Sequence, residues 1–175
     1  MTMAVAGAWV KFESPEGRFS VSIPIYWTNH LSGTSWGATT KNKDGVLDYL
    51  YSMRYDDVFK GQDTSIEAVA KDEEASILKD HPETKVAKKF FKFQGFPACE
   101  LIYVVVIPSV SAERVIRRLI VVNGRIYNAE VDKVSVSLTV DDASHVKEVK
   151  ATSFPNSVKF FNSLKFIHPE LNKMP

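Results

Sequence analysis

The fold is decided by the stretch ACELIYVVVIPSVSAERVIRRLIVVNGRIYNAEV, residues 98–131. Its segment 101–107 is apolar at every position, as in a strand that is covered on both faces. Two further apolar segments flank Asn123-Gly124, a dipeptide that favours the type I′ turn of a β-hairpin because both residues tolerate a positive φ. The stretch therefore predicts consecutive antiparallel strands in the middle of a sheet.

More strands are predicted on both sides of this stretch. Trp9–Ile23 is predicted as a hairpin, because Ser14-Pro15-Glu16-Gly17 suits a type I turn and alternating apolar residues follow it. Strand patterns recur at 36–40, 47–55 and 86–93. Alternation from Val134 to Val140 predicts a further edge strand or strand-like loop.

Two helices are predicted. The first runs from about Thr64 to Lys79, where Thr64 and Glu67 have the spacing of a capping box, and it ends at His81-Pro82. The second begins at Pro155, a residue that suits the first helical position. We expect its buried face to contain Val158, Phe161 and Leu164, with Phe160 beside them.

This order of elements predicts an α+β fold in which an antiparallel sheet of about six to eight strands is sandwiched by helices. We see no linker, repeat or low-complexity segment, so residues 1–175 are expected to form a single domain with its core at about 9–167.

Composition narrows the classes of function. Of 175 residues, 45% are hydrophobic and 25% charged, and the formal net charge of +1 argues against a nucleic-acid-binding module. A single cysteine excludes an intrachain disulfide, and no apolar run reaches the roughly 18 residues of a membrane helix. The first residues lack the pattern of a secretory signal, so the chain as written is expected to be cytoplasmic, or exported if a signal peptide was removed.

Several local motifs resemble the PsbP-like family, which includes the extrinsic photosystem II subunit and a Ran-binding nuclear-import regulator. The matching segments are FESPEGRFSV (12–21) with Pro24 and Trp27, FQGFPA (93–98), NGRIY (123–127) and FFNSLKF (160–166). The resemblance spans roughly Trp9 to Ile167, and its motifs are turns, core aromatics and a helix end. It implies the family's fold, an antiparallel sheet between helices, and it carries no chemistry.

The sequence departs from the family in two respects. The stretch from Asp132 to Val149 is longer than the family usually needs. The Ran-binding member uses an acidic surface patch, whereas Asp56, Asp57 and Asp63 lie near one another here without making a compelling cluster.

No catalytic, cofactor-binding or metal-binding constellation is evident, and no cofactor is expected. The four histidines, His30, His81, His145 and His168, lack the spacing of a helical zinc pair. Cys99 lies in an apolar strand, as a buried inert thiol does. Glu73-Glu74 would point about 100° apart on a helix, so a solvated helix face is expected there rather than an acid–base pair.

The candidate interaction surface consists of polar and aromatic residues without a catalytic pattern: His30, Trp36, Arg114, Arg118 and Arg125. By strand parity Arg114 and Arg118 share one face, and Arg117 lies on the other. The arginines are expected either to form a basic patch for an anionic ligand or to face solvent, paired with Glu113 or Glu130.

The sequence thus predicts a non-enzymatic binding or accessory domain that interacts with an unidentified protein partner. Binding of nucleic acid is not expected. The alternative is a carrier of a small ligand or lipid, with an apolar cavity between the sheet and a helix. A cavity above roughly 300 Å³ lined by aromatic residues would favour the carrier, whereas a close-packed interior would favour the interaction module.

Overall fold

The structure of the chain is a computed structural model that describes residues 8–24, 28–32, 34–41, 45, 47–107, 111–136 and 155–172, with the backbone alone at 28–32, 107, 111, 135, 136 and 155. Its elements follow one another as β1 (Trp9–Ser14), β2 (Phe19–Pro24), β3 (Thr28–Ser32), β4 (Ser35–Lys41), β5 (Leu47–Asp57), α1 (Ile66–Asp80), β6 (Ala87–Phe93), β7 (Phe96–Ile107), β8 (Ser111–Val122), β9 (Arg125–Val136), α2 (Pro155–Ser163), β10 (Lys165–Phe166) and the 3-10 helix η3 (Pro169–Asn172).

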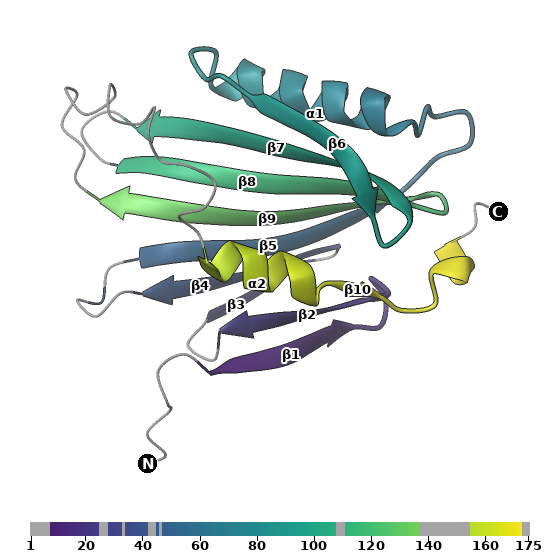
Figure 1. Cartoon of the computed structure of the whole chain (residues 1–175), viewed down its shortest axis with the longest axis horizontal. Helices are drawn as coiled ribbons and strands as arrows, with labels where there is room; N and C mark the ends of the chain where they lie inside the picture. Colours follow the sequence, from purple (N-terminus) through teal and green to yellow (C-terminus); the bar gives the residue numbers. More distant parts are fainter. Residues whose placement is uncertain are drawn as a thin grey trace.

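Two antiparallel sheets are present among the described residues. The large sheet has seven strands in the order β3-β4-β5-β9-β8-β7-β6, and the small sheet has three in the order β1-β2-β10. Figure 1 shows the small sheet below the large one. The predicted α+β class and antiparallel sheet are confirmed, whereas the separate small sheet was not predicted.

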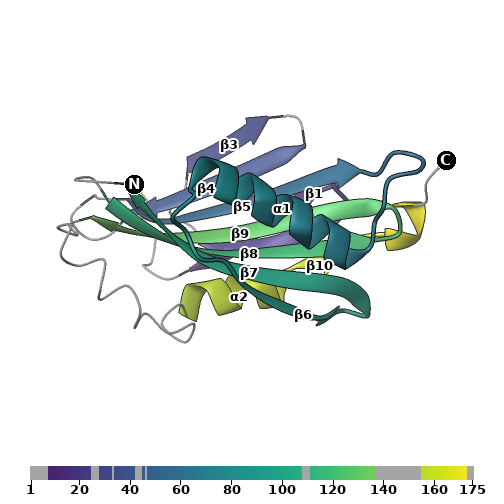
Figure 2. The same ribbon diagram turned by 90° about the horizontal axis from the view of Figure 1, so that it is seen from above.

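The two helices cover opposite faces of the large sheet (Figure 1 and Figure 2). Helix α1 packs mainly over β7 and β8, and the core beneath it contains Ile66, Ala70, Ile77, Cys99, Leu101, Val115 and Leu119. The other face is covered by α2 and the small sheet, whose core contains Phe19, Val21, Ile23, Ile116, Ile120, Tyr127, Phe160, Phe161 and Leu164. Neighbouring residues of β8, such as Val115 and Ile116, thus enter different cores, as the period of a strand requires.

The β8–β9 hairpin is the longest pairing of the large sheet. Asn123 and Gly124 have φ values of 47° and 83°, which confirms the predicted turn with two positive φ angles. From there the register is unbroken up to Ser111 opposite Val136. The prediction of a separate strand from Val134 was therefore wrong, because residues 134–136 continue β9; residues 137–149 lie outside the described part of the chain.

Both helices differ in detail from the prediction. The side chain that caps α1 belongs to Ser65, which accepts a hydrogen bond from the backbone N–H of Ala68 at 3.3 Å. The capping box predicted at Thr64 and Glu67 was therefore wrong, because Ser65 is the N-cap and Ala68 has no side-chain acceptor to return the bond. His81 ends the helix as expected. The predicted burial of Phe161, of Phe160 beside it, and of Leu164 just after α2 is confirmed, whereas Val158 is 53% exposed and its predicted burial was wrong.

None of the helices within the described ranges has the length and apolar composition that crossing a lipid bilayer requires.

We predict that Phe160→Ala lowers the free energy of unfolding by about 3–5 kcal/mol, because it leaves a cavity at a fully buried position where Phe160 meets Tyr51 and Phe161. Val158→Ala in the same helix is the matched control and should change it by no more than about 0.5 kcal/mol, since Val158 is largely exposed. Urea unfolding measures both values, and equal losses would contradict the described packing of α2.

Candidate functional site

A groove runs beside α1, where the helix leaves β9 and β5 uncovered. It consists of two adjoining cavities that share Arg54 and Glu73. The first, of about 380 Å³, is lined by Arg54, Glu73, Ser76, Ile77, Asp80, His81, Tyr103, Val105, Glu113, Val115, Arg117, Glu130 and Asp132. The second, of about 340 Å³, is lined by Arg54, Asp56, Asp57, Phe59, Gln62, Asp63, Val69, Asp72, Glu73, Leu119, Ile126 and Asn128. We call the two together the acidic groove.

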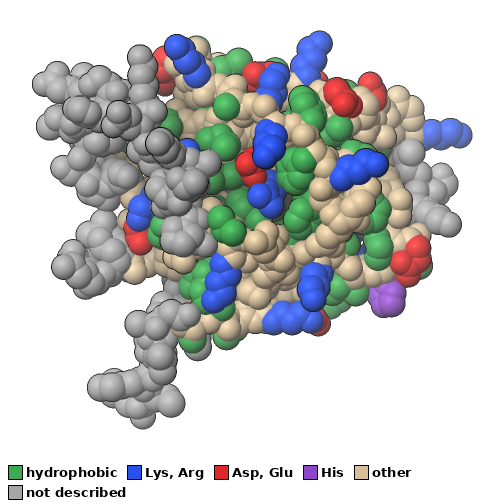
Figure 3. Space-filling view, viewed as in Figure 1, with side chains coloured by type: hydrophobic (Ala, Val, Ile, Leu, Met, Phe, Trp, Pro, Cys, Tyr) green, Lys and Arg blue, Asp and Glu red, His purple; other side chains and the backbone are tan. Residues whose placement is uncertain are grey.

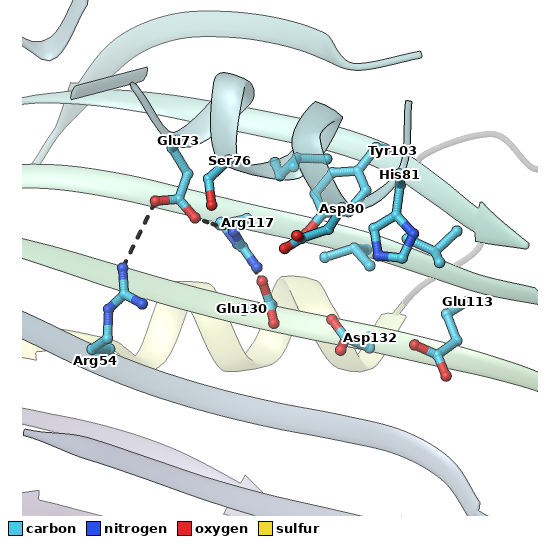
Figure 4. A pocket seen from close by; sticks show the side chains of 13 residues that line it. Arg54, Glu73, Ser76, Asp80, His81, Tyr103, Glu113, Arg117, Glu130 and Asp132 are labelled. Atoms are coloured by element: carbon cyan, nitrogen blue, oxygen red, sulfur yellow. Dashed lines mark hydrogen bonds and ion pairs between the residues drawn. The ribbon is translucent and has the colours of Figure 1, made fainter. Parts of the chain in front are cut away.

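Arg117 forms the centre of the groove. Its Nη1 donates to the Glu73 carboxylate of α1, and its Nε donates to the Glu130 carboxylate of β9 (Figure 4). Burial lowers the pKa of the Arg117 guanidinium, but the charges of Glu130, Tyr103 and Glu73 raise it by more. The pKa of Arg117 is therefore raised overall. Arg54 extends the network from β5, with its Nη2 at 3.7 Å from the other Glu73 oxygen.

Asp132 lies at the far end of the first cavity, where Figure 4 shows the carboxyl groups of Glu130, Asp132 and Glu113 in a row below Asp80 and His81. The residue is only 7% exposed, and its Oδ1 has no hydrogen-bond partner in the described part of the chain. Its pKa is raised to about 8, first by burial and then by the charges of Glu130 and Glu113, against a smaller lowering by Arg117.

The second cavity gathers four aspartates from the end of β5, the loop before α1 and the middle of α1. Asp57 binds Arg125, with distances of 2.6 and 2.9 Å to its two oxygens, and Asp56 accepts from the Nε of Arg54 at 3.1 Å. Asp63 accepts a 2.8 Å hydrogen bond from the backbone N–H of Ser65, and this bond lowers its pKa. Asp72 completes the set from α1.

From the sequence we inferred that Asp56, Asp57 and Asp63 do not make a compelling acidic cluster. This interpretation was wrong. The loop after β5 folds back toward α1, so these three residues line one cavity together with Asp72 and Glu73. Glu73, predicted to lie on a solvated helix face, is instead an ion-pair partner of Arg117 and Arg54.

Arg114 and Arg118 of the predicted interaction surface lie away from the groove, whereas Arg125 binds Asp57 in its lining. Arg118 donates from Nε to Glu100 at 2.7 Å and its guanidinium carbon lies 4.3 Å from the centre of the Phe161 ring, on the face that α2 covers. Arg114 shares that face by strand parity, whereas Arg117 lies on the other, as predicted. Of the two interpretations offered for the arginines, pairing with Glu130 is observed for Arg117. On the α2 side of the sheet, Lys and Arg side chains are spread among apolar ones (Figure 3).

The remaining predicted surface residues do not join these arginines. Trp36 is 4% exposed and stacks on Phe12 at 4.7 Å. It lies in the predicted strand 36–40, which is part of β4 and forms a hairpin with β3. Arg125 is 5% exposed and bound to Asp57, so it too contributes no surface. The backbone of His30 lies in β3, but its side chain, like Trp27 and His145, lies outside the described residues. Binding of a partner by Arg114 and Arg118 stays a prediction.

In the lining of the groove, carboxyl groups outnumber arginines. The described residues contain no group of three or more His, Cys, Asp or Glu side chains arranged to hold a metal ion. Cys99 is fully buried, as predicted, and burial raises the pKa of its thiol.

Comparison with known proteins identifies the fold. No family model and no curated protein matches the chain. Among solved structures it is similar to cyanobacterial PsbP (CyanoP) from Synechocystis sp. PCC 6803, with 9% identity and a TM-score of 0.60 over 94% of this chain and 95% of that one. The chain is also similar to the Ran-binding protein Mog1p of Saccharomyces cerevisiae, with 11% identity and a TM-score of 0.62 over 94% of this chain and 98% of that one. A protein of Bacteroides thetaiotaomicron gives 12% and 0.57 over 89% of this chain and 47% of that one.

At these identities the similarity shows the fold alone. The chain has the PsbP-like fold, the fold that PsbP and Mog1p share, as the resemblance in its sequence predicted.

We predict that Asp132→Asn stabilises the domain more at pH 8 than at pH 4.5. The pKa of Asp132 is higher in the folded chain than its unfolded value of about 3.9, so the folded state binds more protons and loses stability as the pH rises from about 4 to about 8. Asparagine removes this loss. The gain in Tm over wild type should therefore increase by at least about 2–4 °C across this window, the shift that about 1 kcal/mol produces.

Thermal unfolding at both pH values measures this difference, with the exposed Asp72→Asn as the matched control. Parallel pH profiles for wild type and Asp132→Asn would show that Asp132 titrates as an ordinary carboxyl group.

Proposed function

We propose that the chain is a non-enzymatic binding domain whose acidic groove receives a positively charged segment of a protein partner. The observation that carries this proposal is the charge of the groove. Five carboxylates line each cavity and Glu73 is shared, so that nine different carboxylates oppose the guanidiniums of Arg54 and Arg117. Because the chain as a whole has a net charge of +1, this negative charge is a local property of the groove.

Part of this negative charge is not neutralised within the domain. Glu73, Glu130, Asp56 and Asp57 are engaged in ion pairs with arginines. The other five carboxyl groups have no ion-pair partner among the described residues: Asp63, Asp72, Asp80, Glu113 and Asp132. Of these, Asp132 has a raised pKa and is largely protonated near neutral pH, so the unneutralised charge belongs to the other four. They are distributed over both cavities, so a basic segment lying along α1 would meet them in succession.

An exposed aromatic side chain adds an apolar contact at one end of the groove. Phe59, in the loop after β5, lines the second cavity and is 81% exposed. A partner segment that combines positive charges with one apolar residue fits both features, since aromatic side chains at interfaces contribute much of the binding energy.

The fold comparison agrees with a binding domain only in general terms. Mog1p, which has the same fold, is a Ran-binding protein. Because unrelated functions share folds, the choice of the groove and of a basic partner depends on the charges described above.

The two cavities give no support to the alternative of an apolar-ligand carrier. Both exceed roughly 300 Å³, but their linings are mainly charged rather than aromatic. The aromatic side chains that would line an apolar cavity, Tyr51, Tyr127, Phe160 and Phe161, are fully buried in the core on the other side of the large sheet.

We predict that the domain binds a fluorescent peptide rich in lysine and arginine, and that affinity falls about tenfold or more between low and high salt because exposed charges are screened. The double variant Asp63→Asn/Asp72→Asn should weaken binding about fivefold to tenfold, as expected for the loss of two exposed charge contacts. Fluorescence anisotropy measures both effects.

The matched control is Glu13→Gln, which removes an exposed carboxylate of β1 outside the groove and should leave affinity unchanged. Equal binding of an acidic peptide, or equal affinity of the double variant and wild type, would contradict the proposal.

A further inference from the structure

The first cavity contains a carboxyl group that lacks a partner. Asp132 is more than nine-tenths buried, lines the cavity, and leaves its Oδ1 without a hydrogen bond to the described chain. Such an acceptor normally destabilises a protein, because its desolvation is not compensated. Its position is explained if a donor from outside enters the cavity.

No arginine of the cavity takes this role. Arg117 is already bound to Glu73 and Glu130, and Arg54 lies at the junction with the second cavity, near Glu73 and Asp56. Glu113, the nearest carboxylate on β8, likewise has no ion-pair partner among the described residues, and it raises the pKa of Asp132 rather than neutralising it. The Glu113–Asp132 end of the cavity therefore holds two carboxyl groups without an ion-pair partner among the described residues.

We propose that the Glu113–Asp132 end of the groove is a subsite for a primary ammonium group, supplied by a lysine of the basic partner segment. The lysine as its source rests on the function proposed above, whereas the preference for an ammonium rests on the cavity itself. An ammonium is compact and carries three donors, enough for the Asp132 carboxyl group and a neighbouring carboxylate. A planar guanidinium binds bidentately only where both oxygens of a carboxylate are open to it, whereas Oδ1 of Asp132 is buried.

The remaining lining suits the stem of a lysine. Ile77, Val105 and Val115 line the same cavity as the carboxylates, together with the ring of Tyr103. Lysine buries its four methylene groups against such apolar surface while its charged end reaches polar groups. The cavity of about 380 Å³ has room for this side chain.

Binding is expected to depend on pH. With a pKa of about 8, Asp132 is largely protonated near neutral pH, and an incoming ammonium would ionise it and release its proton. Affinity should therefore rise as the pH increases from about 6 to about 8, well below the pKa of the lysine itself. The charged or titratable groups around it are Arg54 on β5, Tyr103 on β7, Glu113 and Arg117 on β8, Glu130 on β9, and Glu73, Asp80 and His81 on α1 and its cap.

The experiment compares three peptides that differ at one position, lysine, arginine or the uncharged norleucine, by calorimetry with the whole chain. We expect the lysine peptide to bind about tenfold more tightly than the norleucine peptide, as a charge-assisted hydrogen bond allows, and more tightly than the arginine peptide. Asp132→Asn should remove this preference and its pH dependence. Asp72→Asn, in the second cavity, should retain both, and His81→Gln should retain the pH dependence.

A second measurement uses n-butylamine, the free equivalent of the lysine side chain, and follows the backbone amides by NMR. Shifts around Glu113 and Asp132 that vanish in Asp132→Asn support the ammonium subsite. If butylamine causes no such shifts and the three peptides bind equally, the subsite is overturned, while binding of basic peptides still supports the proposed function. If butylamine binds and no basic peptide does, the ammonium subsite stands, and both the partner segment and the lysine as its source are overturned.

Discussion

The ion pairs of Arg117 fix helix α1 relative to the large sheet. One guanidinium, only 17% exposed at its side chain, joins Glu73 of α1 to Glu130 of β9. The apolar contacts of α1 lie over β7 and β8. The ion pairs of Arg117 connect the helix to the next strand, β9. A buried charge cluster is costly unless every member is paired. Here the pairing joins α1 to β9 beside the groove, while an apolar core fills the other face of the sheet.

The same arrangement separates two kinds of surface in one domain. On the α2 side, Arg118 is paired with Glu100 and lies over the ring of Phe161. On the α1 side, carboxylates exceed the available arginines, and Asp132 is left with a raised pKa. A nearly neutral chain can therefore present a strongly acidic groove, which its composition alone does not reveal.

The sheet was predictable because its signals are local, whereas the groove was not. Asn123-Gly124 and the continuous apolar segment 101–107 determine pairing and burial within a few residues. The groove depends on the register that sets Arg117 opposite Glu130 and on the place where α1 crosses the strands. Parity along β8 and β9 could have placed Arg117 and Glu130 on one face, but the return of Asp63 toward α1 has no periodic signal. The exposure of Val158 likewise reflects which side of α2 meets the sheet.

Mapping where a basic peptide binds is the most direct test of the acidic groove as a binding site. Backbone amide shifts of the labelled domain, recorded during titration with a lysine-containing peptide, report contacts residue by residue. We expect the largest shifts at 56–63, along α1 and at 128–132, on the two sides of the groove. Shifts concentrated on α2 and the small sheet, with the groove unaffected, would contradict it.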